Sequence, residues 1–444
     1  MNKNNIFNLF KNLYLPIIVG SFIFLWDLHK SLPIFFENKF FDINLRYLIL
    51  ILIGPAFFKI LKEIKKGKFN FIKYFFIIFL ILFVHLYANI LYEEKELSNN
   101  LLGSLLFTLA LYTISYFYYN EIMENISKIL FIFLIIFLVT TVYSVFNFHN
   151  DTPYFCGGIP NFLNNSLGLN LDPERNFREF RLSFRHLLFF ENSHLGFIAP
   201  GVVLYSITQI YNKNYNKLKI SLFCFFLVIC FIKSSTTFFV GTIASLITIL
   251  IFNFKNISKR LMIIFILFLS VLLTIVFSNN ECKNRFVPSY NSENILGSKT
   301  TVLLKETLQV TGGQSISAGV FFRSFLITIH SIKSKPFGWG INRYEEAFNE
   351  YNKTYPPKSD LFNYLNNRDA VNNFNKLIVE FGVFSFFIFF LIFKFLIDKR
   401  INLENKLFLL PIVITQMIRG AGYFNGGFIL IIILIFFAFI REKK

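Results

Sequence analysis

Long apolar runs follow one another along most of the chain, with short polar connections between them. A helix that crosses a bilayer needs roughly 20 consecutive, mostly apolar residues. The runs therefore predict an all-α, polytopic integral membrane protein with about 12 transmembrane helices. We place these spans at 13–27, 45–62, 71–91, 100–119, 128–148, 184–209, 218–233, 234–253, 260–278, 373–397, 406–420 and 423–441. The polar break at 233–237 separates spans seven and eight, and it could instead interrupt one broken helix.

Composition supports this class of protein. Of the 444 residues, 55% are apolar and 16% are charged, against roughly 25% charged in an average soluble domain. A soluble globular domain, a disordered chain and a DNA-binding module are excluded. Four cysteines are too few for a disulfide framework, although Cys156 and Cys282 could pair outside the membrane.

The net charge of +18 is explained mainly by where the lysines and arginines lie. Cations near the cytoplasmic surface orient spans, so the charge predicts no nucleic-acid partner. With 12 spans, the basic connections fall on one side together with both termini, which are then cytoplasmic. These connections are 59–73, 211–219, 253–260 and 394–406.

Two long segments are left on the outer side. The predicted division is five N-terminal helices, a first periplasmic loop, helices six to nine, a large helical periplasmic loop, and helices ten to twelve. The corresponding residues are 1–148, 149–183, 184–278, 279–372 and 373–444. Long loops usually have a function, so we looked for chemistry there.

The first loop ends in a cluster of cations on the side that should contain few of them: Arg175, Arg178, Arg181, Arg185 and His186. A guanidinium presents a planar set of donors that suits phosphate oxygens. Arg181 and Arg185 are therefore candidate phosphate ligands. Interfacial anchoring is the alternative, as are salt bridges to nearby glutamates.

Glu191 and His194 follow at the start of span six. Residues three apart share one helix face, and an acid and an imidazole inside a membrane indicate a functional site by default. The alternative is that the two side chains only satisfy each other or a neighbouring helix.

The large loop is predicted to contain an amphipathic helix over 317–334. Its apolar face has Phe321, Phe322, Phe325, Leu326, Ile329 and Ile332, and its polar face has Arg323, Ser324, Thr328, His330 and Ser331. Pro336 and the glycines at 338 and 340 should end it, and a second short helix over 341–348 contains Arg343. Such a helix could also simply lie on the membrane surface.

Two further features flank the last spans. Asn372-Asn373-Phe374 and Glu380-Phe381-Gly382 lead into span ten, and Arg419 and Tyr423 lie in a glycine-rich turn between the last two spans. This turn could approach a ligand closely, or it could be a tight turn with an interfacial anchor. No spacing of His and Cys is typical of a metal site, so neither a metal nor a cofactor is expected.

Taken in order, these motifs resemble the O-antigen polymerase and O-antigen ligase superfamily. The resemblance runs from span six to the C-terminus. It rests on Arg181 and Arg185 before Phe190-Glu191-Asn192-Ser193-His194, on Arg323 followed by Pro336-Phe337-Gly338-Trp339-Gly340, and on Arg419-Gly-Ala-Gly-Tyr423-Phe424. Asn192 stands where the family often has Pro. Before span ten the family, and especially the ligases, often has His-Asn. Val371-Asn372 stands there in this chain, and the missing His favours a polymerase.

The resemblance implies a glycosyltransferase of the bacterial inner membrane, with its active site facing the periplasm, that polymerises undecaprenyl-pyrophosphate-linked oligosaccharides into surface polysaccharide. Arg181, Arg185, Arg323 and Arg419 would hold the pyrophosphate without metal. Glu191 or His194 would accept the acceptor proton or orient the acceptor, and His330, Arg343 and Tyr423 are further candidates. Partners would be the lipid-linked oligosaccharide and membrane lipid, and could include a chain-length regulator protein.

Two alternatives remain. A ligase would pass the finished glycan to a lipid core or a protein. A flippase or other transporter would predict two matching six-span halves with a site near the midplane, and the halves of this chain do not match.

Overall fold

The protein was analysed as a computed structural model, which describes residues 19–20, 23, 54–66, 99–147, 188–189, 192–233, 235–278, 316–356, 365–420, 422–423 and 427–441. The described residues form α-helices and short 3-10 helices, and no strand occurs among them. The prediction of an all-α fold is confirmed for this part of the chain.

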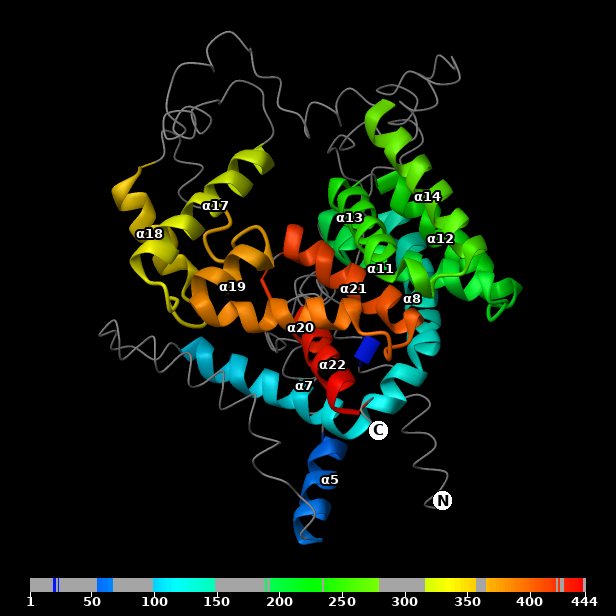
Figure 1. Ribbon diagram of the computed structural model, residues 1–444, viewed down its shortest axis with the longest axis horizontal. Coiled ribbons are helices and arrows are strands. Elements are labelled where there is room, and N and C mark those ends of the chain that lie inside the picture. The colour runs from blue at the N-terminus through cyan, green and yellow to red at the C-terminus, as the bar shows by residue number, and fades with distance from the viewer. Residues whose placement is uncertain are drawn as a thin grey trace.

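The helices follow the order of the predicted elements (Figure 1). They are α5 (Gly54–Lys65), α7 (Asn99–Glu124), α8 (Ile126–Asn147), α11 (Asn192–Tyr211), α12 (Lys217–Lys233), α13 (Thr236–Asn253), η3 (Phe254–Asn256), α14 (Lys259–Ser278), α17 (Ile316–Ser334), α18 (Tyr344–Thr354), α19 (Asn373–Phe381), η6 (Gly382–Phe384), α20 (Ser385–Ile397), α21 (Leu403–Ile418) and α22 (Phe428–Arg441).

Within the described ranges, three helical segments are long and apolar enough to cross a membrane. They are Ile126–Ser144, Thr236–Asn256 and Asn373–Ile397. They coincide with three predicted spans, at 128–148, 234–253 and 373–397. Their length and apolar composition are those of helices that cross a membrane. The total of about 12 spans is not confirmed. The predicted spans at 13–27 and 71–91 lie almost entirely outside the described residues.

One predicted boundary needs correction. Span six was placed from residue 184, but Leu188 and Phe189 are not helical and α11 begins only at Asn192. Both residues are buried among other apolar side chains. An apolar sequence pattern reports burial, and burial does not require that the backbone be helical.

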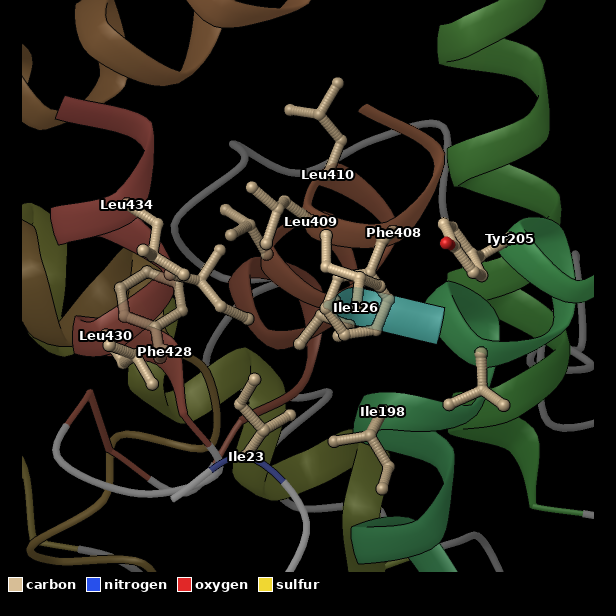
Figure 2. Packing of buried hydrophobic residues seen from close by; sticks show 14 of the residues in the cluster. Ile23, Ile126, Ile198, Tyr205, Phe408, Leu409, Leu410, Phe428, Leu430 and Leu434 are labelled. Carbon is tan, nitrogen blue, oxygen red and sulfur yellow. The ribbon is translucent and has the colours of Figure 1, made fainter. Parts of the chain in front are cut away.

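The centre of the bundle is formed by α11, α13 and α21, which pack against one another. Two glycines allow the helices to approach closely. A Cβ on Gly201 of α11 would meet the Phe408 carbonyl oxygen of α21 at 2.5 Å, and one on Gly241 of α13 would overlap Thr415 of α21. Small residues at crossings are typical of packing in membranes, where lipid is as apolar as the helices themselves. Figure 2 shows Ile198 and Phe408 in this apolar packing, together with Leu430 of α22.

A buried lysine joins helices α13, α20 and α21. Lys406, at the start of α21, is only 1% exposed. Its Nζ donates to Asn253 Oδ1 at 2.8 Å and to the Leu396 carbonyl at 2.9 Å, and Asn253 Nδ2 donates to the same carbonyl at 3.1 Å. In the sequence analysis Lys406 belongs to the basic connection 394–406 that orients the spans. In the structure it also links α13, α20 and α21.

Helices α17, α18 and α19 form what we call the loop-helix unit, residues 316–356 and 365–381. In Figure 1, α17 and α18 lie on the far side of α19 and α21 from α12 and α14. The backbone of the turn after α17 forms hydrogen bonds with the backbone at the end of α19. Trp339 N donates to the Val379 carbonyl at 2.9 Å, and Gly340 N donates to the Glu380 carbonyl at 2.9 Å.

Glycines make that crossing possible. Gly338 and Gly382 have φ of +92° and +54°, in the left-handed region that favours glycine. A Cβ on Gly382 would overlap the Pro336 carbonyl, and one on Gly338 would overlap the Glu380 carbonyl. The predicted end of the helix at 336–340 is therefore confirmed, and the same residues dock the turn onto α19.

Candidate functional site

The helix α17 buries its polar face and exposes much of its apolar face. Arg323, Ser324, Thr328 and Ser331 are buried together with Ile327, while Phe321, Phe325 and Ile332 are among the exposed large apolar residues. The predicted amphipathic helix is confirmed. Its polar side faces the protein, and this orientation could not be read from the sequence pattern.

Arg323 is a buried cation in aromatic surroundings. It is 3% exposed, and its guanidinium carbon lies 5.9 Å from the ring centre of Phe348 and 5.6 Å from that of Tyr351. One terminal nitrogen donates to Asn352 Oδ1. Burial lowers the pKa of the guanidinium from its usual value, and Tyr351 and Tyr344 act in the opposite direction. An arginine nevertheless stays protonated in proteins.

The charge on Arg323 has no acidic counterpart among the described residues within ion-pair distance. Its Nε is buried and meets no acceptor in this part of the chain. A buried charge is costly unless it is paired. This guanidinium can therefore accept an anion, and phosphate oxygens match its donors.

The neighbouring Ser324 fixes the loop that leads into α19. Its Oγ donates to the Ala370 carbonyl at 2.6 Å, and it accepts from Tyr344 Oη at 3.1 Å and Asn375 Nδ2 at 3.0 Å. All these residues are buried. Ala370 and Val371 have φ of 57° and 64°, a region that is costly for a β-branched residue. Such strain persists only where surrounding contacts hold it, and it is common at functional sites.

The backbone of the segment that contains Arg419 lies next to the loop that leads into α19. Arg419 follows α21, and its N donates to the Thr415 carbonyl at 2.7 Å. The next residue, Gly420, donates from its N to the Val371 carbonyl at 2.8 Å. The two strained residues are thus held from both sides, by α17 and by the segment that contains Arg419. Of the four predicted phosphate ligands, Arg323 and Arg419 are connected in this way.

Glu380 is the acid around which the loop-helix unit is organised. Its side chain is completely buried and accepts from Asn342 N at 2.9 Å, from Tyr344 N at 3.2 Å and from Tyr423 Oη. Lys376 Nζ lies 3.8 Å from Glu380 Oε1. Tyr423, a predicted site residue, is thus held by Glu380 and positions the last connection.

Two other candidates in the large loop have different surroundings. Arg343, directly before α18, is buried, and its Nε lies 3.7 Å from Glu346 Oε1. His330 is partly exposed, with its Nε2 3.7 Å from Glu350 Oε1. Arg343 therefore lies inside the unit, whereas His330 reaches its surface.

His194 lies in the first turn of α11 and is 6% exposed. Its ring centre is 5.6 Å from that of Phe197. Two residues further on, Gly196 lies against the start of α13, because a Cβ there would meet Phe238 N at 2.8 Å. Arg181, Arg185 and Glu191 lie outside the described residues, so the proposed pairing of Glu191 with His194 stays a prediction.

The sequence did not single out Lys233 or Lys376 as site residues. Lys233 ends α12 and is buried beside Ser235 and Thr237. Lys376 is buried in α19 and donates to the Arg368 carbonyl at 2.6 Å. A lysine directly after the apolar run 222–232, on the side predicted to be the outer one, was the available signal for Lys233. For Lys376 no local signal existed.

The comparisons with known proteins bear on this arrangement directly. Residues 220–390 match the family model Wzy_C, O-Antigen ligase. The superfamily resemblance is confirmed. This O-antigen ligase region covers less than half of the chain, from α12 into α20, and it contains Lys233, Arg323, His330, Arg343 and Glu380. A search of curated proteins gave no match.

The O-antigen ligase region and the apolar helices together support a membrane protein of polysaccharide biosynthesis. The family acts on lipid-linked glycans. Arg419 and Tyr423 lie outside the matched residues. Tyr423 contacts Glu380 of the region, and Gly420, the neighbour of Arg419 in the chain, contacts Val371.

Proposed function

We propose that the protein polymerises undecaprenyl-pyrophosphate-linked oligosaccharide repeat units into surface polysaccharide at the periplasmic face of the inner membrane. The observation that carries this proposal is Arg323. It is a buried guanidinium inside the O-antigen ligase region that has no carboxylate near it among the described residues. A diphosphate is the anion that a lipid-linked glycan would supply.

In the proposed reaction, the bond between the anomeric carbon and the pyrophosphate oxygen breaks, and its electron pair leaves with the pyrophosphate. A hydroxyl of the incoming repeat unit forms the new glycosidic bond and loses its proton to Glu191 or His194. Preorganised cations stabilise the negative charge that develops on the leaving group. Arg323 would do this from α17, with Arg419, Arg181 and Arg185 from the flanking segments and no metal ion involved.

The two residues before α19 support a polymerase over a ligase. The ligases often have His-Asn there, and the histidine would be a candidate base. Here Val371 replaces the histidine and is buried, while the Asn372 side chain caps α19 by accepting from Asn375 N at 2.7 Å, a role that asparagine performs well at a helix start. Ligation to a lipid core or a protein remains the alternative, and the experiment below separates the two.

The test begins with deletion of the gene and electrophoresis of the surface glycan. A polymerase predicts that only single repeat units reach the surface, whereas a ligase predicts full-length polymer that accumulates on undecaprenyl. Unchanged glycan length on the surface would refute both reactions.

Complementation with variants then tests the site. Arg323→Ala and Arg323→Lys should both fail to restore polymer while inserting at normal abundance, because lysine keeps the charge but lacks the planar donors. Arg368→Ala is the matched control, since Arg368 is largely exposed and pairs with Glu345 at 2.8 Å. Near-normal polymer with both Arg323 variants would remove the guanidinium from the mechanism.

A further inference from the structure

We propose that the outer edge of α17 and α18 forms a saccharide-binding subsite, built from His330, Glu350, Tyr351 and Tyr355, that holds the glycan of the lipid-linked donor. This inference rests on the proposed function, because it assigns one end of the same substrate. It adds a place for the sugar beside the place for the phosphate.

The four side chains form one continuous cluster. The ring centre of His330 lies 5.7 Å from that of Tyr351 and 6.2 Å from that of Tyr355, and both pairs are edge-to-face. The two tyrosine rings are 5.1 Å apart. His330 Nε2 approaches Glu350 Oε1 at 3.7 Å.

This cluster is open where a ligand would need it. Tyr355 is 45% exposed, and the side chains of His330 and Glu350 are 25% and 43% exposed. Tyr351, by contrast, is buried. A buried ring that supports an exposed ring gives a fixed aromatic surface, and little conformational freedom is lost when a ligand binds to it.

The chemistry of these groups suits a sugar. A pyranose ring presents an apolar C–H face, which packs on an aromatic ring, and hydroxyls around its edge, which need hydrogen-bond partners. Glu350 and His330 offer an acceptor and a second polar group beside the tyrosine surface. An acyl chain would remove water from this carboxylate and imidazole without offering either of them a hydrogen bond.

The position relative to Arg323 assigns the glycan to the donor. Tyr351 belongs to both environments, since its ring centre lies 5.6 Å from the Arg323 guanidinium carbon and 5.1 Å from the ring centre of Tyr355. A diphosphate at Arg323 would therefore be followed directly by its first sugars along Tyr351 and Tyr355.

The orientation of α17 excludes lipid from the same surface. His330 is nine residues from Phe321, which is two and a half turns of a helix. It therefore lies opposite the exposed apolar residues Phe321 and Phe325. The apolar face can meet the bilayer while the His330 face meets the glycan.

The test uses the full-length protein in detergent or nanodiscs and compares Tyr355→Ala with Tyr355→Phe. Lys353→Ala is the control, because Lys353 is exposed on the same helix. With the lipid-linked repeat as substrate, Tyr355→Ala should raise KM about tenfold with kcat little changed, and shorten the polymer. Tyr355→Phe and Lys353→Ala should behave as the wild type.

A binding measurement separates this inference from the proposed function. The probe is the repeat oligosaccharide released from its lipid by mild acid, followed by saturation-transfer NMR. Transfer from the wild type that is lost in Tyr355→Ala supports the subsite whatever the reaction is. Unchanged KM, polymer length and saturation transfer in Tyr355→Ala would overturn the subsite, even if Arg323→Ala abolishes polymerisation and the proposed function stands.

Discussion

The helical bundle around α11, α13 and α21 and the loop-helix unit are held together by different interactions. In the bundle, apolar side chains from α11, α21 and α22 interlock, and glycines bring the helices into contact (Figure 2). In the loop-helix unit, a small apolar cluster that includes Ile327, Trp339 and Phe348 is surrounded by buried polar groups.

The difference follows from what each region must hold. Lipid tails are as apolar as leucine, so helices in a bundle gain stability mainly from close packing. The loop-helix unit is proposed to hold a charged, hydroxyl-rich substrate, and it places an arginine, a serine and a glutamate where an ordinary core would have leucine. Polar groups in such a site must be satisfied within the protein. Substitutions should therefore act differently in the two regions.

The largest effect is expected for Glu380→Ala. It would leave Asn342 N, Tyr344 N and Tyr423 Oη without their shared acceptor, and removing one partner of a buried charged group costs about 3–5 kcal/mol. We expect a large fall in Tm of the purified protein in nanodiscs. Tyr423→Phe, which removes only one donor, should lower Tm much less. Equal effects of the two variants would mean that Glu380 does not organise the unit.

A paired glycine substitution compares the two regions directly. Gly382→Ala would place a Cβ against the backbone of Pro336 at a left-handed φ, and we expect it to cost about 2–3 kcal/mol. Gly241→Ala would meet the Thr415 side chain, including its Cβ at 2.8 Å, so α13 and α21 must move slightly apart. Because Gly241 has a helical backbone that alanine also adopts, no backbone strain is added, and the cost should be smaller. Thermal unfolding of both variants measures this. The reverse order would show that the bundle crossing is the less adaptable of the two.

Lys406→Met tests the buried polar contacts of Lys406 within the apolar helical bundle. The variant keeps the length of the side chain but removes the donor to Asn253 Oδ1 and the Leu396 carbonyl. Since an unsatisfied buried polar group costs about 1–3 kcal/mol, we expect a moderate fall in Tm with polymer length unchanged at permissive temperature. Lys399→Met, at an exposed position between the same helices, should leave Tm unchanged.

The smallest effect on stability is expected for Phe325→Cys, because Phe325 is 45% exposed and surface changes usually lie within about 0.5 kcal/mol. This variant instead tests the orientation of α17 relative to the membrane. If the apolar face of α17 meets lipid, a water-soluble maleimide should label Phe325→Cys slowly in membranes and faster in mild detergent. Lys353→Cys should be labelled quickly in both. Rapid labelling of Phe325→Cys in membranes would place this face in water.

The sequence by itself determined the local features of this protein. Apolar runs gave helices near the predicted positions 128–148, 234–253 and 373–397, and the amphipathic period over 317–334 and its end at Pro336 were predicted correctly. Periodicity and helix-ending residues act between near neighbours, so the chain carries this information directly. Arg323 was singled out as a candidate for the same reason, because a guanidinium in an otherwise apolar segment is visible in the sequence.

Only the tertiary structure decided which face of α17 is buried and what its polar residues contact. Ser324 with Ala370, Glu380 with Tyr423, and Lys406 with Asn253 are pairs that are far apart in the sequence. No local pattern specifies such partners, because they depend on which elements pack together. The sequence therefore located the charged residues, and the packing of the helices decided which of them are buried and which contacts they make.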